Sequence, residues 1–171
     1  MLHSESVETP RRRPGRGVRR WALLGGLVLV MCQSALAQTI GQARDSIVRT
    51  ALNPLGVPYV WGGTDPAKGL DCSGFVLGVY RTAGLELPRT SNEQFLFTQY
   101  LPPTQVRRGD LVFFNMKLKS GRPVDHVGIY LGRGYFAHAS FSRGIIVDRL
   151  QSTYYRQRLR GIRRHPALAG R

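Results

Sequence analysis

The chain has 171 residues, of which 20% are charged, and a formal net charge of +15. This length accommodates one domain of ordinary size, and the sequence has no internal repeat that would indicate a second. The excess of 25 Lys+Arg over 10 Asp+Glu favours polyanionic partners.

Residues 1–37 are predicted to be a secretory signal peptide. Six arginines between positions 11 and 20 form a basic segment, residues 21–31 are apolar and uncharged, and Ala35-Leu36-Ala37 is a small-x-small cleavage site. The apolar run has 11 residues, whereas a membrane-spanning helix needs roughly 20. An uncleaved anchor is the alternative. Lipoprotein processing at Cys32 is not expected, because the preceding residue is Met31 rather than a small one.

Residues 38–171 are therefore expected to form a single exported domain in the periplasm or cell wall. Without the six arginines and two glutamates of the leader, they hold 19 Lys+Arg and 8 Asp+Glu, a net charge of +11. An exported protein meets anionic envelope groups, so the anionic cell envelope is the expected partner and nucleic acid is not. A monomer is expected. Lys117, Lys119, Arg122 and residues 156–164 are candidates for the basic contact surface.

The periodicity of apolar residues predicts helices first and strands second, an α+β fold with an antiparallel sheet. A capping-box pattern, Thr90 to Glu93, opens the third helix, and Gly84 ends the second. The predicted helices are 42–52, 73–83 and 90–100, and the predicted strands are 111–114, 126–131, 135–140, 144–148 and 159–163. Residues 150–155 are predicted to form a helical turn, and residues 166–171 a loose tail.

Cys72 is the candidate nucleophile. It is the only cysteine in residues 38–171, so no disulfide can form within them. An unpaired cysteine in an oxidising compartment implies a reactive thiol or an intermolecular bridge. Asp71 is a predicted N-cap that places Cys72 at a helix start, where the helix dipole and a protonated imidazole would lower the thiol pKa. The negative charge of Asp71 opposes this lowering of the thiol pKa. The backbone amide of Cys72 is a candidate oxyanion donor.

Two of the four histidines are candidates for the partner of Cys72. His3 lies in the leader, and His165 is predicted to be a surface residue of the tail. A three-residue loop ending at Gly134 sets His126 opposite Ser140, with both candidate histidines on one face of a hairpin. A two-residue loop would put them on opposite faces. The first register makes His126 the base and His138 its orienting residue.

Two other readings of these histidines remain open. Strand histidines are often satisfied core residues, and Cys72, His126 and His138 are a possible zinc set. Structural zinc sites usually show closely spaced ligand pairs such as Cys-x-x-Cys, which this chain lacks. No metal or cofactor is therefore expected. Asp125 is left out of the site because its parity places it on the face opposite His126.

The sequence resembles the NlpC family of bacterial cell-wall cysteine peptidases, which have a papain-like fold. The resemblance covers about residues 45–164, and its motifs follow the order of the family. They are Pro58-Tyr59-Val60-Trp61-Gly62-Gly63, Asp71-Cys72-Ser73-Gly74-Phe75-Val76, Leu87-Pro88-Arg89-Thr90-Ser91, Gly109-Asp110-Leu111-Val112-Phe113-Phe114, His126-Val127-Gly128-Ile129-Tyr130-Leu131 and Phe136-Ala137-His138-Ala139.

The resemblance implies a nucleophile at Cys72, a base at His126 and an orienting residue at His138. It also implies a role for Tyr59 near the oxyanion, and Asp71 and Ser73 are the accompanying substrate or oxyanion candidates. The implied substrate is the stem peptide of peptidoglycan, cut either between D-glutamate and the diamino acid or at D-alanyl crosslinks. Three hypotheses follow: a secreted cysteine endopeptidase of peptidoglycan, an amidase or acyltransferase on the same fold, and a non-catalytic cell-wall-binding module.

Overall fold

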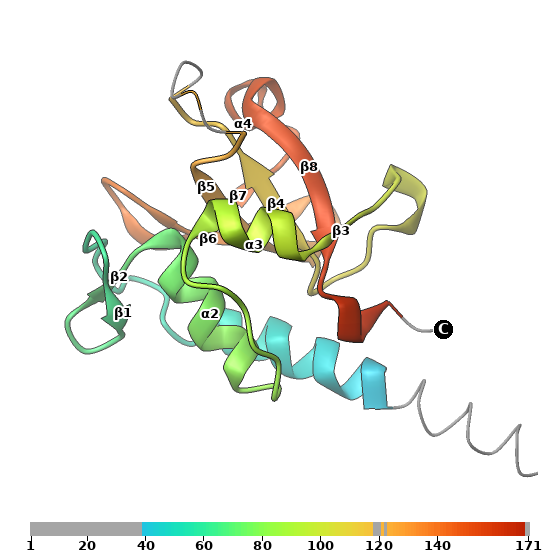
Figure 1. Cartoon of the computed structure of the whole chain (residues 1–171). Coiled ribbons are helices and arrows are strands. Elements are labelled where there is room, and N and C mark those ends of the chain that lie inside the picture. Colours follow the sequence, from blue (N-terminus) through green and yellow to red (C-terminus); the bar gives the residue numbers. More distant parts are fainter. Residues whose placement is uncertain (1–38, 118–120, 122, 170–171) are drawn as a thin grey trace, which may run out of the picture. The chain divides into compact units, whose positions relative to one another are not determined.

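The computed structural model describes residues 39–117, 121 and 123–169. They form a layer of helices packed on an antiparallel sheet, so the predicted α+β class is confirmed (Figure 1). The predicted signal peptide, Lys119 and Arg122 lie outside the described residues. Among the residues described, no helix is long and apolar enough to cross a membrane.

Helices and strands follow the predicted order. Residues 39–52 are helical. The other helices are α2 (Cys72–Arg81), α3 (Ser91–Phe97) and α4 (Thr153–Arg158), with short 3-10 turns η1 (Pro103–Gln105) and η2 (Pro166–Leu168). The larger sheet contains β3 (Gln99–Tyr100), β4 (Leu111–Phe114), β5 (His126–Gly132), β6 (Tyr135–Ser140), β7 (Gly144–Arg149) and β8 (Leu159–Arg164), in the order β3-β8-β4-β5-β6-β7. A small hairpin, β1 (Thr64–Asp65) with β2 (Gly69–Leu70), was not predicted.

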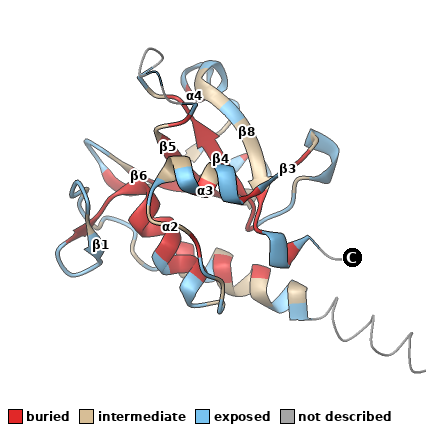
Figure 2. Ribbon diagram, in the orientation of Figure 1, coloured by how far each residue is buried: buried red, intermediate tan, exposed pale blue. Residues whose placement is uncertain are grey.

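The sheet is covered on both faces, which explains the uninterrupted apolar run of β4. Leu111 and Phe113 join the core between the sheet and α2, while Val112 and Phe114 pack on the other face with Phe136 and the α4 residue Tyr155. Alternate side chains of a strand point to opposite faces, so a strand buried on both faces has no polar position. Figure 2 shows the buried residues concentrated in α2 and the central strands.

The turn between β5 and β6 differs from the prediction, although the histidine register survives. Gly132 rather than Leu131 lies opposite Tyr135, so the connection is a two-residue turn. Arg133 (φ 52°) and Gly134 (φ 80°) both have positive φ, as a type I′ turn requires. A bulge between Tyr130 and Gly132 adds one residue, and Ile129 again pairs with Ala137. The bulge thus restores the parity that the shorter turn would have lost.

The predicted third helix ends too far along the chain. The capping box of Thr90 and Glu93 is confirmed, but α3 stops at Phe97, and Tyr100 pairs with Arg163 in strand β3. The Arg163 guanidinium donates to the carbonyl oxygen of Thr98, whose backbone is already extended (ψ 157°). Pairing with β8 therefore overrides the helical pattern at residues 98–100.

The C-terminal predictions were wrong in three places. His165 is buried, not on the surface, and its Nε2 donates to the carbonyl oxygen of Glu86 at 3.0 Å. Residues 166–168 form η2 rather than a loose tail, and Leu168 is 3% exposed. Arg164 is not available to an anionic surface, because it is buried in an ion pair with Asp110 at 2.8 Å.

Candidate active site

Cys72 is the first residue of α2, where a cap on the preceding residue holds it. Asp71 has extended backbone (φ −88°, ψ 175°), and its Oδ1 accepts from the backbone N–H of Gly74 at 2.6 Å. Gly74 itself is required, because a Cβ there would lie 2.1 Å from the carbonyl oxygen of Gly63. The predicted N-cap is confirmed, and close contact with the 62–63 loop seals the helix start.

The carboxylate of Asp71 is fully engaged in hydrogen bonds. Besides Gly74, its donors are the backbone N–H of Gly62, the hydroxyl of Ser73 and both terminal nitrogens of Arg89, the shorter at 2.6 Å. Arg89 also donates to the Ser73 hydroxyl at 2.9 Å. This bidentate clamp was not predicted, although Arg89 stands in one of the motifs. Its hydrogen bond with Asp71 raises the pKa of Arg89.

The thiol of Cys72 is held in its neutral form in the free protein. Burial raises its pKa to about 11, and the negative charge of Asp71 adds to the increase, while a hydrogen bond from the Val127 backbone opposes it. The expected lowering by the helix start does not prevail, because the side chain is only 7% exposed. The bond from Val127 also places the thiol beside β5, one residue from His126.

His126 and His138 are joined directly. Their rings are perpendicular, and Nε2 of His126 lies 2.9 Å from Nδ1 of His138. Both side chains come from one face of the β5–β6 hairpin, as the sequence predicted, and both are buried. Gly128 makes room, since a Cβ there would lie 3.1 Å from the Cβ of His138. Burial, together with the neighbouring His138, lowers the pKa of His126 to about 3, so this imidazole is neutral at neutral pH.

Beyond His138 lie three side chains that sequence reasoning missed. Asp148 on β7 is 3.2 Å from His138 Nε2, and Tyr155 on α4 donates to the same carboxylate at 2.6 Å. Arg143, in the β6–β7 turn, pairs with Asp148 at 2.6 Å. The sequence signal for Asp148 was limited to an acidic residue at the end of the strand that follows the strand of His138. The register of β6 with β7, which brings it near, is not visible in the sequence.

Tyr59 and Ser73, two further residues of the predicted site, share a groove with Cys72. Tyr59 lines the same groove and packs on Phe141 with ring centroids 5.3 Å apart. Burial, and then the charges of Cys72 and Asp71, raise the pKa of Tyr59 to about 12. The phenol therefore keeps its proton, which suits a hydrogen-bond donor.

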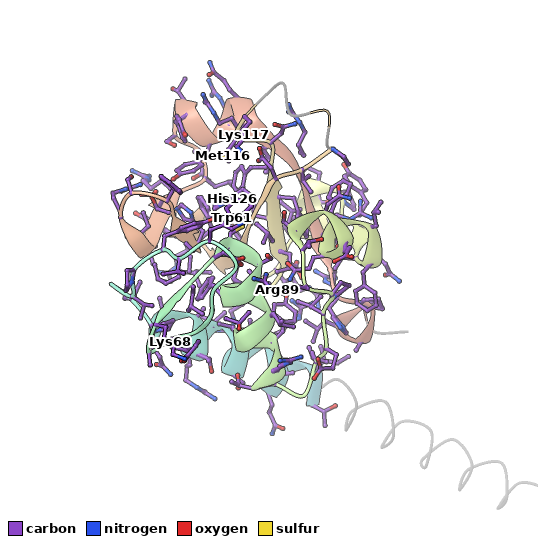
Figure 3. All side chains as sticks on the ribbon, turned by 60° about the vertical axis from the view of Figure 1, so that its left-hand side comes forward. Trp61, Lys68, Arg89, Met116, Lys117 and His126 are labelled. Atoms are coloured by element: carbon purple, nitrogen blue, oxygen red, sulfur yellow. The ribbon has the colours of Figure 1, made fainter. Side chains whose placement is uncertain are left out.

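One groove with a volume of about 1510 Å³ brings all six predicted site residues together. It also contains the clamp residue Arg89 and the Asp148–Tyr155 pair. Figure 3 labels lining residues from distant parts of the chain, namely Trp61, Arg89, the adjacent Met116 and Lys117, and His126. Cys72 and both histidines thus open on a space that can take an extended substrate.

Asp125, left out of the predicted site, has a structural task. Its carboxylate accepts from the backbone N–H groups of Met116 and Lys117, at 2.6 and 3.0 Å, and closes the loop before β5. Within residues 39–117, 121 and 123–169, no group of three His, Cys, Asp or Glu side chains is arranged to hold a metal ion. The ring nitrogens Nε2 of His126 and Nδ1 of His138 are used for each other.

Comparison with known proteins gives the family. The model of the NlpC/P60 family matches residues 56–164, which is more than half of the chain. This chain belongs to the NlpC/P60 family. The resemblance noted in the sequence is therefore confirmed, and so is the papain-like α+β fold of the NlpC/P60 domain.

Two curated relatives illustrate the match. The gamma-DL-glutamyl hydrolase of Bacillus subtilis is 39% identical over 119 residues, covering 69% of this chain and 28% of that protein. The murein DD-endopeptidase MepS/murein LD-carboxypeptidase of Escherichia coli is 42% identical over 110 residues, covering 64% of this chain and 56% of that protein. This NlpC/P60 chain thus matches only part of the length of these relatives.

Solved NlpC/P60 structures agree with the fold. An NLP/P60 protein of Staphylococcus aureus described as similar to lipoprotein has a TM-score of 0.66 and 38% identity, covering 72% of this chain and 41% of that one. The peptidoglycan hydrolase RipB of Mycobacterium tuberculosis has a TM-score of 0.61 and 29% identity, covering 74% of this chain and 66% of that one.

Proposed function

We propose that this NlpC/P60 chain is a secreted cysteine endopeptidase that hydrolyses amide bonds in the peptides of peptidoglycan. The observation that carries the proposal is the placement of Cys72 at a helix start, in one groove with the hydrogen-bonded pair of His126 and His138. The names of the relatives support the substrate class, since one is a murein endopeptidase and another a peptidoglycan hydrolase.

In the proposed reaction, the Cys72–His126 pair starts uncharged. As Sγ of Cys72 forms a bond to the substrate carbonyl carbon, His126 takes the thiol proton. The carbonyl oxygen becomes an oxyanion, which the backbone N–H of Cys72 and the hydroxyl of Tyr59 stabilise. The C–N bond then breaks, and the amine leaves with the proton from His126. Water, deprotonated by His126, cleaves the thioester and regenerates the thiol.

The basic surface is the proposed contact with the anionic cell envelope. Lys117 is exposed at the groove, and Arg156 and Arg158 lie in the last turn of α4. The leader at residues 1–37 would bring the protein there by export, and the exported domain is proposed to be a monomer.

The decisive experiment compares the exported protein with its Cys72→Ala variant on sacculi and on defined muropeptides, read by mass spectrometry. We expect the wild type to release peptide fragments and the variant to release none, and the fragment masses name the bond. Intact mass of the same preparation should place the new N-terminus at Gln38.

Other product patterns would replace the proposal. Release of whole stem peptides from the glycan, or transfer to an added amine, would indicate the amidase or acyltransferase alternative. Sacculus binding by both proteins without cleavage by either would favour a non-catalytic wall-binding module.

A further inference from the structure

Two polar groups, the carboxylate of Asp148 and the hydroxyl of Tyr155, contact Nε2 of His138 and leave this nitrogen only one protonation state. Oδ2 of Asp148 accepts from the Tyr155 hydroxyl at 2.6 Å and from Arg143 at 2.6 Å, and it lies 3.2 Å from Nε2 of His138. Burial alone would raise the pKa of Asp148, but the bonds from Tyr155, Arg143 and His138 hold it below its usual value. An ionised carboxylate only accepts hydrogen bonds, so Nε2 of His138 must donate.

Tyr155, held by the same carboxylate, imposes the same condition. Its oxygen is 3.2 Å from His138 Nε2. Its proton points to Asp148, at the shorter distance of 2.6 Å, so toward His138 the hydroxyl oxygen can only accept. The Tyr155 ring packs against Phe114 and Phe136, with ring centroids 5.5 and 4.9 Å away. Both neighbours of Nε2 therefore require a proton on it.

The consequence passes to His126. Burial lowers the pKa of His138, so its imidazole is neutral at neutral pH, and a proton on Nε2 leaves Nδ1 with a free lone pair. That lone pair faces His126 Nε2 at 2.9 Å, which must then donate. A neutral His126 that carries its proton on Nε2 has an unprotonated Nδ1.

We propose that Asp148 and Tyr155 are positioning residues that set the tautomers of His138 and His126, so that Nδ1 of His126 is the atom that takes the proton of Cys72. This inference rests on the proposed function only in naming Cys72 as the nucleophile and His126 as its base. In the step, the S–H bond breaks, the proton binds Nδ1, and the electron pair of sulfur forms the bond to the electrophilic carbon. His126 becomes an imidazolium whose Nε2–H still donates to Nδ1 of His138. The carboxylate of Asp148 offsets the new positive charge.

The opposite arrangement would disable the base. A proton on Nδ1 of His138 would turn Nε2 of His126 into an acceptor and move the proton of His126 to its Nδ1, which could then not take the proton of Cys72. In serine peptidases, the wrong histidine tautomer costs about 10⁴-fold in kcat. Asp148 acts through one additional ring, so we expect Asp148→Ala to cost roughly 10- to 100-fold. Tyr155→Phe keeps the ring packing and removes only the hydroxyl, and it should cost less.

Two measurements that need no peptidoglycan test the proposal, and kinetics on the substrate complete it. Long-range ¹H–¹⁵N spectra of the full protein should show both histidines protonated on Nε2 in the wild type, and a mixture of tautomers at His138 in Asp148→Ala. Alkylation of Cys72 by iodoacetamide near pH 7 should slow by the same factor in that variant, and kcat should fall with KM unchanged. Asp65→Ala is the matched control, because this exposed carboxylate lies outside the groove.

The proposal is overturned if wild-type His138 carries its proton on Nδ1, or if the folded Asp148→Ala variant is alkylated as fast as wild type. Should Asp148→Ala fail to fold, the wild-type spectrum and Tyr155→Phe decide by the same criteria. The expected tautomers and alkylation rates in a protein that cuts no peptidoglycan would refute the proposed function and leave this inference standing. The titratable and charged groups around His138 are His126 on β5, Asp148 on β7 with its partner Arg143, and Tyr155 on α4.

Discussion

Two groups of buried polar side chains in this domain handle charge in opposite ways. The first joins Asp110, which is 0% exposed, to Arg44 at 3.0 Å and to Arg164 at 2.8 Å. The second is the pair of Cys72 and His126, where burial raises the pKa of the thiol and lowers the pKa of the imidazole. The first group holds paired charges, and the second is uncharged in the free protein.

This difference separates a structural role from the proposed chemical one. Asp110 connects the helix at residues 39–52 with β4 and β8, and neither Asp110 nor its partners Arg44 and Arg164 line the groove. Asp71 is also clamped by an arginine, but its neighbours are the thiol and the groove. An aspartate–arginine pair is therefore not a functional signal in itself, and the groups beside it decide what it does.

Breaking the structural cluster should have the largest effect on stability. Asp110→Ala would leave two buried guanidinium groups without their carboxylate, which should lower the free energy of unfolding by about 3–5 kcal/mol. Urea denaturation measures the loss. The matched control is Asp65→Ala, which removes an exposed ion pair with Lys68 and should cost about 1 kcal/mol or less. Equal losses in the two variants would contradict the structural role assigned to the cluster.

Acid should next destabilise the fold through the buried, neutral imidazole of His126. The pKa of His126 is about 3 in the folded protein and about 6.5 in an unfolded chain. Between these values the unfolded state binds the extra proton. The contribution of His126 to the free energy of unfolding is therefore fully present above pH 6.5. It falls toward pH 3, by at most about 1.4 kcal/mol per pH unit. The free energy of unfolding should be measured between pH 7 and pH 4 for wild type and for His126→Gln. It should fall more steeply with decreasing pH in wild type, and equal slopes would refute the neutral imidazole.

The clamp on Asp71 should change reactivity more than stability. The Arg89 side chain is 38% exposed, so Arg89→Ala should destabilise the fold less than Asp110→Ala does. The charge of Asp71, which raises the Cys72 pKa, would lose its partner. We therefore expect the pH profile of alkylation by iodoacetamide to move to higher pH, with slower alkylation at pH 8. Arg89→Lys keeps the charge without the bidentate fork, so its pH profile of alkylation should lie between those of wild type and Arg89→Ala. An unchanged profile in Arg89→Ala would show that Arg89 does not tune the thiol.

Short-range chemistry explains what the sequence by itself determined. The alternation of apolar residues, the cap at Asp71 and the capping box at Thr90 act within a few residues, and each appears in the structure where it was predicted. The shared face of His126 and His138 also follows from strand parity, although the turn that delivers it needed a bulge. The α+β order and the placement of Cys72, His126 and His138 could therefore be predicted from local pattern, whereas Tyr59 was implied only by the family resemblance.

Only the tertiary structure decided which distant groups meet. Arg44 lies 66 residues from Asp110 along the chain, and His165 lies 79 residues from the Glu86 carbonyl that it binds. Local pattern carries no information about such pairs, since they depend on which strands become neighbours. The same holds for Asp148 and Tyr155, which reach His138 only because β7 pairs with β6 and α4 covers the sheet. The burial that keeps Cys72 and His126 neutral likewise arises from packing, and it could not be predicted from the residues near them in the sequence.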